Sequence, residues 1–223
     1  MKRARYRIRF SKTGPLRWIS HRDLIRLWER LLRRVDLNLS MSEGFHPKPR
    51  MSFPSALALG TQSIDEVVEF ELTEDLPVGE LAQRLRDDQQ PGLEILKVTA
   101  IPDGSRKAQL KSTTYNLPIP DSHLETLRKR IEAFLRTGTI QVDRKGKMLS
   151  FSVSAEIPYI ALEGSTLVFR MTPGRQASLR PTDLMDALNL NHVIEDGQML
   201  TRTRVELDDE LESQLCVTEQ TDR

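Results

Sequence analysis

The sequence contains a single cysteine, Cys216, among its 223 residues. One cysteine excludes a disulfide within the chain, and it excludes a zinc or iron–sulfur site built from clustered cysteines. No stretch approaches the roughly 20 apolar residues that a transmembrane helix requires, and the chain does not begin with the apolar core of a secretory signal. The sequence therefore predicts a soluble, cytoplasmic protein without membrane contact.

The short motifs of common enzyme classes are also absent. The chain has no glycine-rich dinucleotide fingerprint, no Walker A loop and no serine or cysteine in a nucleophile elbow. Aromatic residues make up only 5% of the chain, and none forms the aromatic strand motif on which RRM domains stack RNA bases. From these absences we expect no cofactor and no metal ion.

Positive charge is concentrated at the N-terminal end, although the net charge of the whole chain is only +1. Residues 1–50 contain fourteen Lys or Arg and four Asp or Glu, whereas acidic residues outnumber basic ones in the rest of the chain. Such an asymmetry is typical of a surface that binds a polyanion. The alternative is a solvated face that is balanced by the acidic remainder of the chain.

A strongly amphipathic helix is predicted over residues 20–34. Apolar residues recur at helical spacing from Leu24 to Val35, and arginines occupy the other side. Ser20 can cap the start of this helix, with Asp23 three residues later. Residues 5–10, just before it, alternate between apolar and basic side chains, which predicts a half-buried strand with its arginines on one face.

The order of the predicted elements indicates an α+β protein made of two ferredoxin-like units in tandem. Residues 1–101 give strand, helix, strand, strand, helix and strand, which is the split βαβ arrangement, with an ordered proline-rich loop between helix and strand. Residues 102–112 are predicted to be a linker. Residues 113–207 repeat the same order with an extra strand, and residues 208–223 lack periodicity and are expected to be disordered.

The basic N-terminal residues are candidates for phosphate contacts, because the planar guanidinium group matches phosphate geometry bidentately. The alternative is that these charges form only the solvated side of the helix and of the loop. The candidate nucleic-acid-binding residues are Arg9, Lys12, Arg17, Arg22, Arg26, Arg30, Arg33, Lys48 and Arg50.

Two histidines are candidates for acid–base chemistry. His21 lies in the first turn of the predicted helix, where the helix dipole favours a neutral imidazole, and His46 lies in the proline-rich loop. If the two converge, they could cleave RNA through its 2′-hydroxyl group. The alternative is that each histidine donates a hydrogen bond that holds the loop to the helix.

A second anion site is predicted near the C-terminal end of the folded region. Arg202 and Arg204 lie in the last predicted strand, and Arg180 precedes a predicted helix. The alternative is that these arginines pair with Glu206 and Asp183 instead of binding a ligand.

Several stretches resemble the radical SAM-linked protein family. They are residues 9–24, residues 42–53 (Ser-Glu-Gly-Phe-His-Pro-Lys-Pro-Arg-Met-Ser-Phe), residues 59–63, residues 179–183 and residues 201–204. The resemblance covers most of residues 3–207. Members of this family are bacterial and are often fused to, or encoded beside, radical SAM enzymes. Since this chain lacks the three closely spaced cysteines that hold a radical SAM cluster, the resemblance implies a radical SAM enzyme as a partner.

Three interpretations of the function follow. The first is a non-catalytic accessory protein that binds RNA or presents a substrate to a radical SAM enzyme. The second is an enzyme that cleaves or modifies RNA with His21 and His46. The third is a protein-binding adaptor whose basic helix docks on an acidic partner surface.

Overall fold

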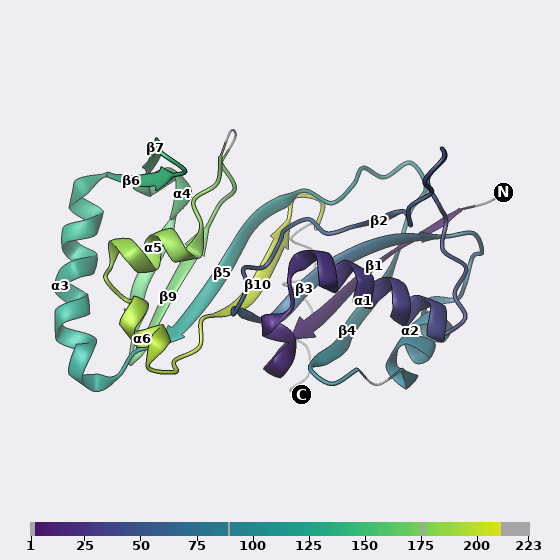
Figure 1. Cartoon of the computed structure of the whole chain (residues 1–223), viewed down its shortest axis with the longest axis horizontal. Coiled ribbons are helices and arrows are strands. Elements are labelled where there is room, and N and C mark those ends of the chain that lie inside the picture. The colour runs from purple at the N-terminus through teal and green to yellow at the C-terminus, as the bar shows by residue number, and fades with distance from the viewer. Residues whose placement is uncertain (1–2, 89, 175–176, 211–223) are drawn as a thin grey trace, which may run out of the picture.

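The fold consists of two halves that lie side by side and share one mostly antiparallel sheet (Figure 1). It is seen in a computed structural model that describes residues 3–88, 90–174 and 177–210. The strand order in the sheet is β4-β1-β3-β10-β5-β9-β8, and β2 pairs with β3 beside this path. The predicted α+β class is confirmed.

The first half is built on the alternating residues of the first strand. Tyr6, Ile8 and Phe10 are fully buried beneath two helices, as the period of two predicts. The first strand pairs antiparallel with β3 and β4, and β2 pairs antiparallel with β3. The elements of this half are β1 (Ala4–Lys12), α1 (His21–Arg34), β2 (Met51–Ser52), β3 (Gln62–Leu72), α2 (Val78–Asp87) and β4 (Leu93–Ile101).

Helix α1 has the orientation that its sequence predicts. The Ser20 hydroxyl oxygen accepts a hydrogen bond from the Asp23 backbone N–H at 3.2 Å, which confirms the predicted cap. Trp28 packs edge-on against Phe10 with 4.9 Å between ring centroids. Because Leu24, Trp28 and their helical neighbours are buried, the opposite side of the helix faces solvent.

The proline-rich loop between α1 and β3 closes on itself through hydrogen bonds of its backbone and of the Ser42 side chain. The Ser42 N–H donates to the Lys48 carbonyl at 2.8 Å, and the Lys48 N–H donates to the Ser42 hydroxyl at 2.9 Å. The Arg50 N–H donates to the Ser40 carbonyl at 2.8 Å. Further along, Phe53 packs against the core of the first half and Leu57 is buried. The loop is therefore fixed at both ends.

The second half contains its own hydrophobic core, separate from that of the first half. Strands β5, β9 and β8 continue the sheet, whereas β6 and β7 form a separate two-stranded hairpin. The elements are β5 (Leu110–Pro118), α3 (Asp121–Thr137), β6 (Thr139–Arg144), β7 (Lys147–Ser152), α4 (Val153–Glu156), β8 (Tyr159–Glu163), β9 (Thr166–Met171), α5 (Pro181–Ala187), α6 (Asn191–Glu195) and β10 (Thr201–Leu207). In addition, the short 3-10 helix η1 (Gly14–Trp18) precedes α1.

Three details differ from the sequence prediction. Strand β8 was not expected, because as an edge strand it buries no residue fully and shows no alternation. Strands β6 and β7 leave the main sheet instead of adding one strand to it. Strand β5 begins at Leu110, inside the predicted linker, because Leu110 pairs with Leu207 of the last strand.

The two halves meet where β3 and β10 run parallel. Only two residue pairs form this ladder, Gln62 with Thr201 and Ser63 with Arg202. On one face of the sheet beyond them lies a small apolar cluster of Val67, Ala108, Val205 and Leu207. The junction is thus narrow, and side chains must contribute to holding it.

None of the helices in the described part of the chain is long and apolar enough to cross a membrane.

Candidate functional site

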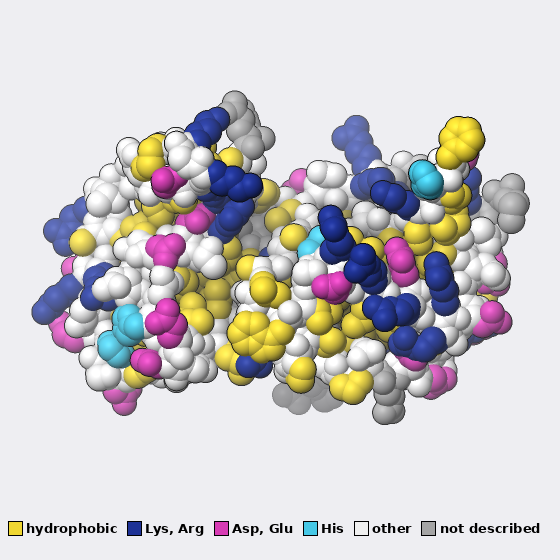
Figure 2. All heavy atoms as spheres, viewed as in Figure 1, with side chains coloured by type: hydrophobic (Ala, Val, Ile, Leu, Met, Phe, Trp, Pro, Cys, Tyr) yellow, Lys and Arg dark blue, Asp and Glu magenta, His cyan; other side chains and the backbone are white. Residues whose placement is uncertain are grey.

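The exposed side of α1 carries a row of four arginines, Arg22, Arg26, Arg30 and Arg33. Figure 2 shows dark blue side chains gathered along this helix. Consecutive members of the row are three or four residues apart, which is about 5–6 Å along the axis, so the row extends over roughly 16 Å. We call these four residues the arginine row.

The arginine row is almost free of internal partners. Among the residues that the structure describes, only Arg26 makes an ion pair, with Asp23 at 3.4 Å, and both side chains are largely exposed. Arg30 donates only to the Arg26 carbonyl, at 3.2 Å. Within the described residues, Arg22 and Arg33 make neither an ion pair nor a side-chain hydrogen bond, so most of the charge on this surface is available to a ligand.

An exposed tryptophan lies just before the N-terminal end of α1. Trp18 ends η1 with 62% of its surface exposed, and the guanidinium carbon of Arg17 lies 5.0 Å from its ring centroid. Gly60 packs against the indole ring of Trp18, and a Cβ atom added at this position would lie only 3.1 Å from the ring. The sequence analysis overlooked Trp18; its place between Arg17 and an apolar residue was the available signal.

The proline-rich loop contributes further exposed side chains. Phe45, His46 and Lys48 are all exposed. Arg50 is half-buried instead, where its Nε donates to the Met41 carbonyl at 3.2 Å and lies 3.7 Å from a Glu71 carboxylate oxygen. Of the two basic loop candidates, only Lys48 is thus on the open surface.

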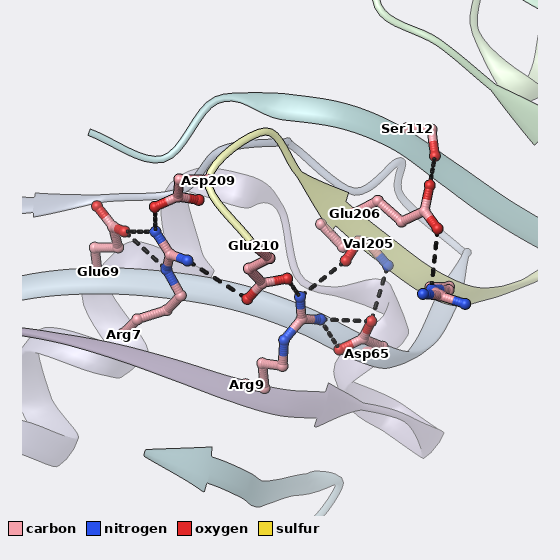
Figure 3. A network of polar contacts seen from close by, with 10 residues as sticks. Arg7, Arg9, Asp65, Glu69, Ser112, Val205, Glu206, Asp209 and Glu210 are labelled. Carbon is pink, nitrogen blue, oxygen red and sulfur yellow. Dashed lines mark hydrogen bonds and ion pairs between the residues drawn. The ribbon is translucent and has the colours of Figure 1, made fainter. Parts of the chain in front are cut away.

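Arg9 is not on the open surface. Of the three β1 arginines that face away from the helices, Arg7 and Arg9 are held by acidic residues (Figure 3). Arg9 binds Asp65 through two hydrogen bonds of 2.5 and 2.7 Å, and it also contacts Glu210. Arg7 binds Glu69 at 2.7 Å and Asp209 at 2.5 Å.

These contacts correct the expectation for the C-terminal segment. Disorder was predicted for residues 208–223, yet Asp209 and Glu210 have defined positions because the arginines of β1 attract them. Residues 211–223 lie outside the described part of the chain, and so does Cys216.

Lys12 is buried beside an ion pair that connects the two halves. Its ammonium group donates to the Ile19 carbonyl at 3.3 Å and has almost no exposed surface. Burial lowers the pKa of Lys12, and the nearby Arg202 lowers it further while Glu66 opposes the change. Lys12 therefore belongs to the interior and is removed from the predicted phosphate-binding surface.

The ion pair itself joins Arg202 of β10 to Glu66 of β3. Arg202 Nη1 lies 3.0 and 3.2 Å from the two Glu66 carboxylate oxygens. Its Nε donates to the Tyr115 hydroxyl at 3.0 Å, and its Nη2 donates to the Ala56 carbonyl at 2.9 Å. Burial raises the pKa of Glu66, and the charge of Arg202 opposes that rise.

The three arginines of the predicted second anion site do not form one cluster. A bulge lies between Arg202 and Arg204 in β10, so Arg202 is buried while Arg204 is exposed and pairs with Glu206 at 3.2 Å. Arg180 is exposed before α5. Asp183 pairs with Arg144 at 2.5 Å. The sequence pattern had not singled out Arg144.

The two histidines occupy different environments. The His21 ring lies edge-on to Phe53 with 5.2 Å between centroids, and burial, followed by the charge of Lys12, lowers the pKa of His21. His46 is exposed. No hydrogen bond or ring contact joins His21 to His46 in the described chain, and no group of three or more His, Cys, Asp or Glu there could hold a metal ion.

Comparison with known proteins places the chain in a family. No curated protein matches it. Among solved structures, the acetolactate synthase small subunit of Thermotoga maritima is 12% identical, with 93% of this chain and 96% of that chain covered, but its TM-score of 0.26 is too low to support any argument. Residues 5–181 match the family described as "Uncharacterized protein conserved in bacteria (DUF2344)". This match spans more than half of the sequence, and the chain therefore belongs to the bacterial family DUF2344.

Proposed function

We propose that this protein binds single-stranded RNA through the arginine row, as an accessory of a radical SAM enzyme. The observation that carries the proposal is the contrast between two groups of arginines. Arg7, Arg9 and Arg202 are neutralised by nearby carboxylates, whereas the arginine row has a single weak ion pair within the described part of the chain. Like charges at this helical spacing repel one another by a few tenths of a kcal/mol per pair, and a polyanion relieves that repulsion.

Trp18 supports RNA over a less specific polyanion. Proteins that bind single strands combine a basic surface with aromatic side chains on which bases stack. Trp18 lies two residues before the cap of α1, with an arginine beside its ring. Phe45 is a second exposed aromatic side chain in the loop that also carries Lys48.

The link to a radical SAM enzyme rests on the sequence resemblance alone. In this role the protein would hold an RNA, or another substrate, for an enzyme that carries the cluster. We further propose that the two halves are ferredoxin-like units in tandem, because each half has the same strand order, β4-β1-β3-β2 in one and β10-β5-β9-β8 in the other.

The test is RNA binding at several salt concentrations, measured by fluorescence anisotropy with a labelled 20-nucleotide single strand. If the arginine row makes four phosphate contacts, the logarithm of the association constant should fall with the logarithm of salt at a slope of about −3. The double variant Arg26→Gln/Arg30→Gln should reduce this slope by about half.

The matched control is Arg128→Gln/Arg136→Gln, which removes the same charge from exposed positions of α3 in the other half. It should leave the slope nearly unchanged. Equal losses in the two double variants, or a wild-type protein without salt-dependent RNA binding, would rule out the arginine row as an RNA site. In the second case, an acidic partner protein becomes the better candidate.

A further inference from the structure

A cleft between the two halves has the size of a small-molecule site. Its volume is about 660 Å³, which lies within the range of ligand pockets in proteins. Residues 54–58 contribute one wall from the first half, and residues 171–173 and 178–182 contribute another from the second half. Figure 2 shows the surface hollowed between the halves, with Lys or Arg side chains gathered beside the hollow.

The charged side chains of the cleft are all positive. Among the described residues that line it are Arg144, Arg180 and Arg202, and no Asp or Glu. Glu66 pairs with Arg202 and Asp183 pairs with Arg144, and neither carboxylate lines the cleft. Since Arg180 makes no ion pair in the described chain, the lining keeps an uncompensated positive charge and the cleft favours an anion.

Two of the arginines retain donors for a ligand. Arg144 uses its Nη2 for the Ser178 carbonyl at 2.9 Å and for Asp183, and its Nε is buried without a partner among the described residues, so only the outer end of its guanidinium group can reach a ligand. The side chain of Arg180 is exposed and makes no ion pair in the described chain. A guanidinium group carries five N–H donors in all, so both arginines can donate to one anionic group.

The rest of the cleft suits an organic body. Leu57, Leu110 and Met171 supply apolar surface. Tyr115 is held in place by its hydrogen bond from Arg202 and by stacking on Phe169 with 5.2 Å between ring centroids. Apolar side chains around a few fixed polar groups are typical of sites that bind small organic molecules.

From this arrangement we infer that the cleft binds a small organic phosphate of about nucleotide size, with its phosphate toward Arg144 and Arg180. A phosphate carries up to two negative charges and therefore gains more than a carboxylate from two separate guanidinium groups. This site is distinct from the arginine row, and it connects the two halves through one ligand.

The test is isothermal titration of the full chain with the four nucleoside monophosphates and with inorganic phosphate as probes. At least one nucleotide should bind more tightly than inorganic phosphate. Arg180→Gln should weaken that binding by about tenfold or more, since it removes a charged hydrogen-bond donor. Arg204→Gln is the matched control, because Arg204 is exposed nearby on β10 but does not line the cleft.

The results separate this site from the RNA surface. Arg26→Gln/Arg30→Gln should bind the nucleotide as wild type does, whatever its effect on RNA. The proposal is overturned if no probe binds at millimolar concentration, if inorganic phosphate binds as tightly as every nucleotide, or if Arg204→Gln weakens binding as much as Arg180→Gln.

Discussion

Replacing Arg202 by methionine should destabilise the protein by about 3–5 kcal/mol, since it leaves a buried charge without its partner. The side chains of Arg202 and Glu66 are only 3% and 2% exposed, so water cannot replace the lost contact. The Tyr115 hydroxyl and the Ala56 carbonyl lose a donor in the same step. For a domain whose total stability is about 5–15 kcal/mol, this is a large part of the whole.

The effect should also depend on pH. Burial raises the pKa of Glu66, and the loss of Arg202 raises it further. Between the unfolded pKa of about 4.3 and the raised folded pKa, the folded chain binds the extra proton, so the free energy of unfolding falls as pH rises. The cost of Arg202→Met should therefore be larger at pH 8 than at pH 5.

Urea unfolding followed by circular dichroism gives the free energies by linear extrapolation. Arg204→Met is the control on the same strand, and as an exposed pair with Glu206 it should cost no more than about 1 kcal/mol. The double variant Arg202→Met/Glu66→Leu should recover part of the loss, because it removes both buried charges. A cost below about 1 kcal/mol for Arg202→Met, or a double variant that loses the full sum of the two single variants, would refute this account of the junction.

Four further outcomes are expected. Burial lowers the pKa of His21 in the folded state, so the unfolded chain binds more protons at this residue and the His21 contribution to the free energy of unfolding falls as pH drops from 7 to 5. Because the raised pKa of Glu66 acts in the opposite direction, the measurement is the difference in free energy of unfolding between wild type and His21→Gln in urea titrations, and this difference should shift against the wild type as pH drops from 7 to 5. Gly92→Ala should reduce the free energy of unfolding by about 1–3 kcal/mol, which a lower melting temperature would show. The reason is that φ of Gly92 is +83° and the new Cβ would lie 2.4 Å from the Thr13 carbonyl oxygen. Trp18→Ala should weaken binding of single-stranded RNA by about 1–3 kcal/mol in anisotropy titrations while leaving the melting temperature nearly unchanged. Limited proteolysis should cut within residues 102–107 before it cuts inside either half, and a first cut within residues 38–60 would contradict this.

Local periodicity was enough to predict much of the first half. The spacing of Leu24, Trp28 and Leu31 predicts both the existence of α1 and its buried side, and Ser20 predicts its start. These features depend on residues that are close in sequence, so a short window of the chain contains the whole signal. The exposure of the arginine row follows from the same period.

The parts that could not be predicted depend on residues far apart in sequence. Alternation places Arg7 and Arg9 on the face of β1 away from the core, but the acidic residues that pair with them come 56 and 62 positions later on β3 and 201 to 203 positions later near the end of the described chain. Arg202 and Arg204 have the same spacing as two residues on one face, and only the bulge between them separates a buried side chain from an exposed one. A pattern in the local sequence cannot reveal a bulge that depends on pairing with another strand.

The ion pair between Glu66 and Arg202 also has a consequence during synthesis on the ribosome. Its partners are 136 residues apart, so at about 5–20 residues per second the ribosome needs roughly 7–27 s to make Arg202 after Glu66. During this interval β1, β3 and β4 can already form their sheet, while the edge of β3 that later receives β10 stays open. An unpaired strand edge invites pairing with other chains, so a nascent chain of this protein is most exposed to aggregation just before its last strand leaves the ribosome.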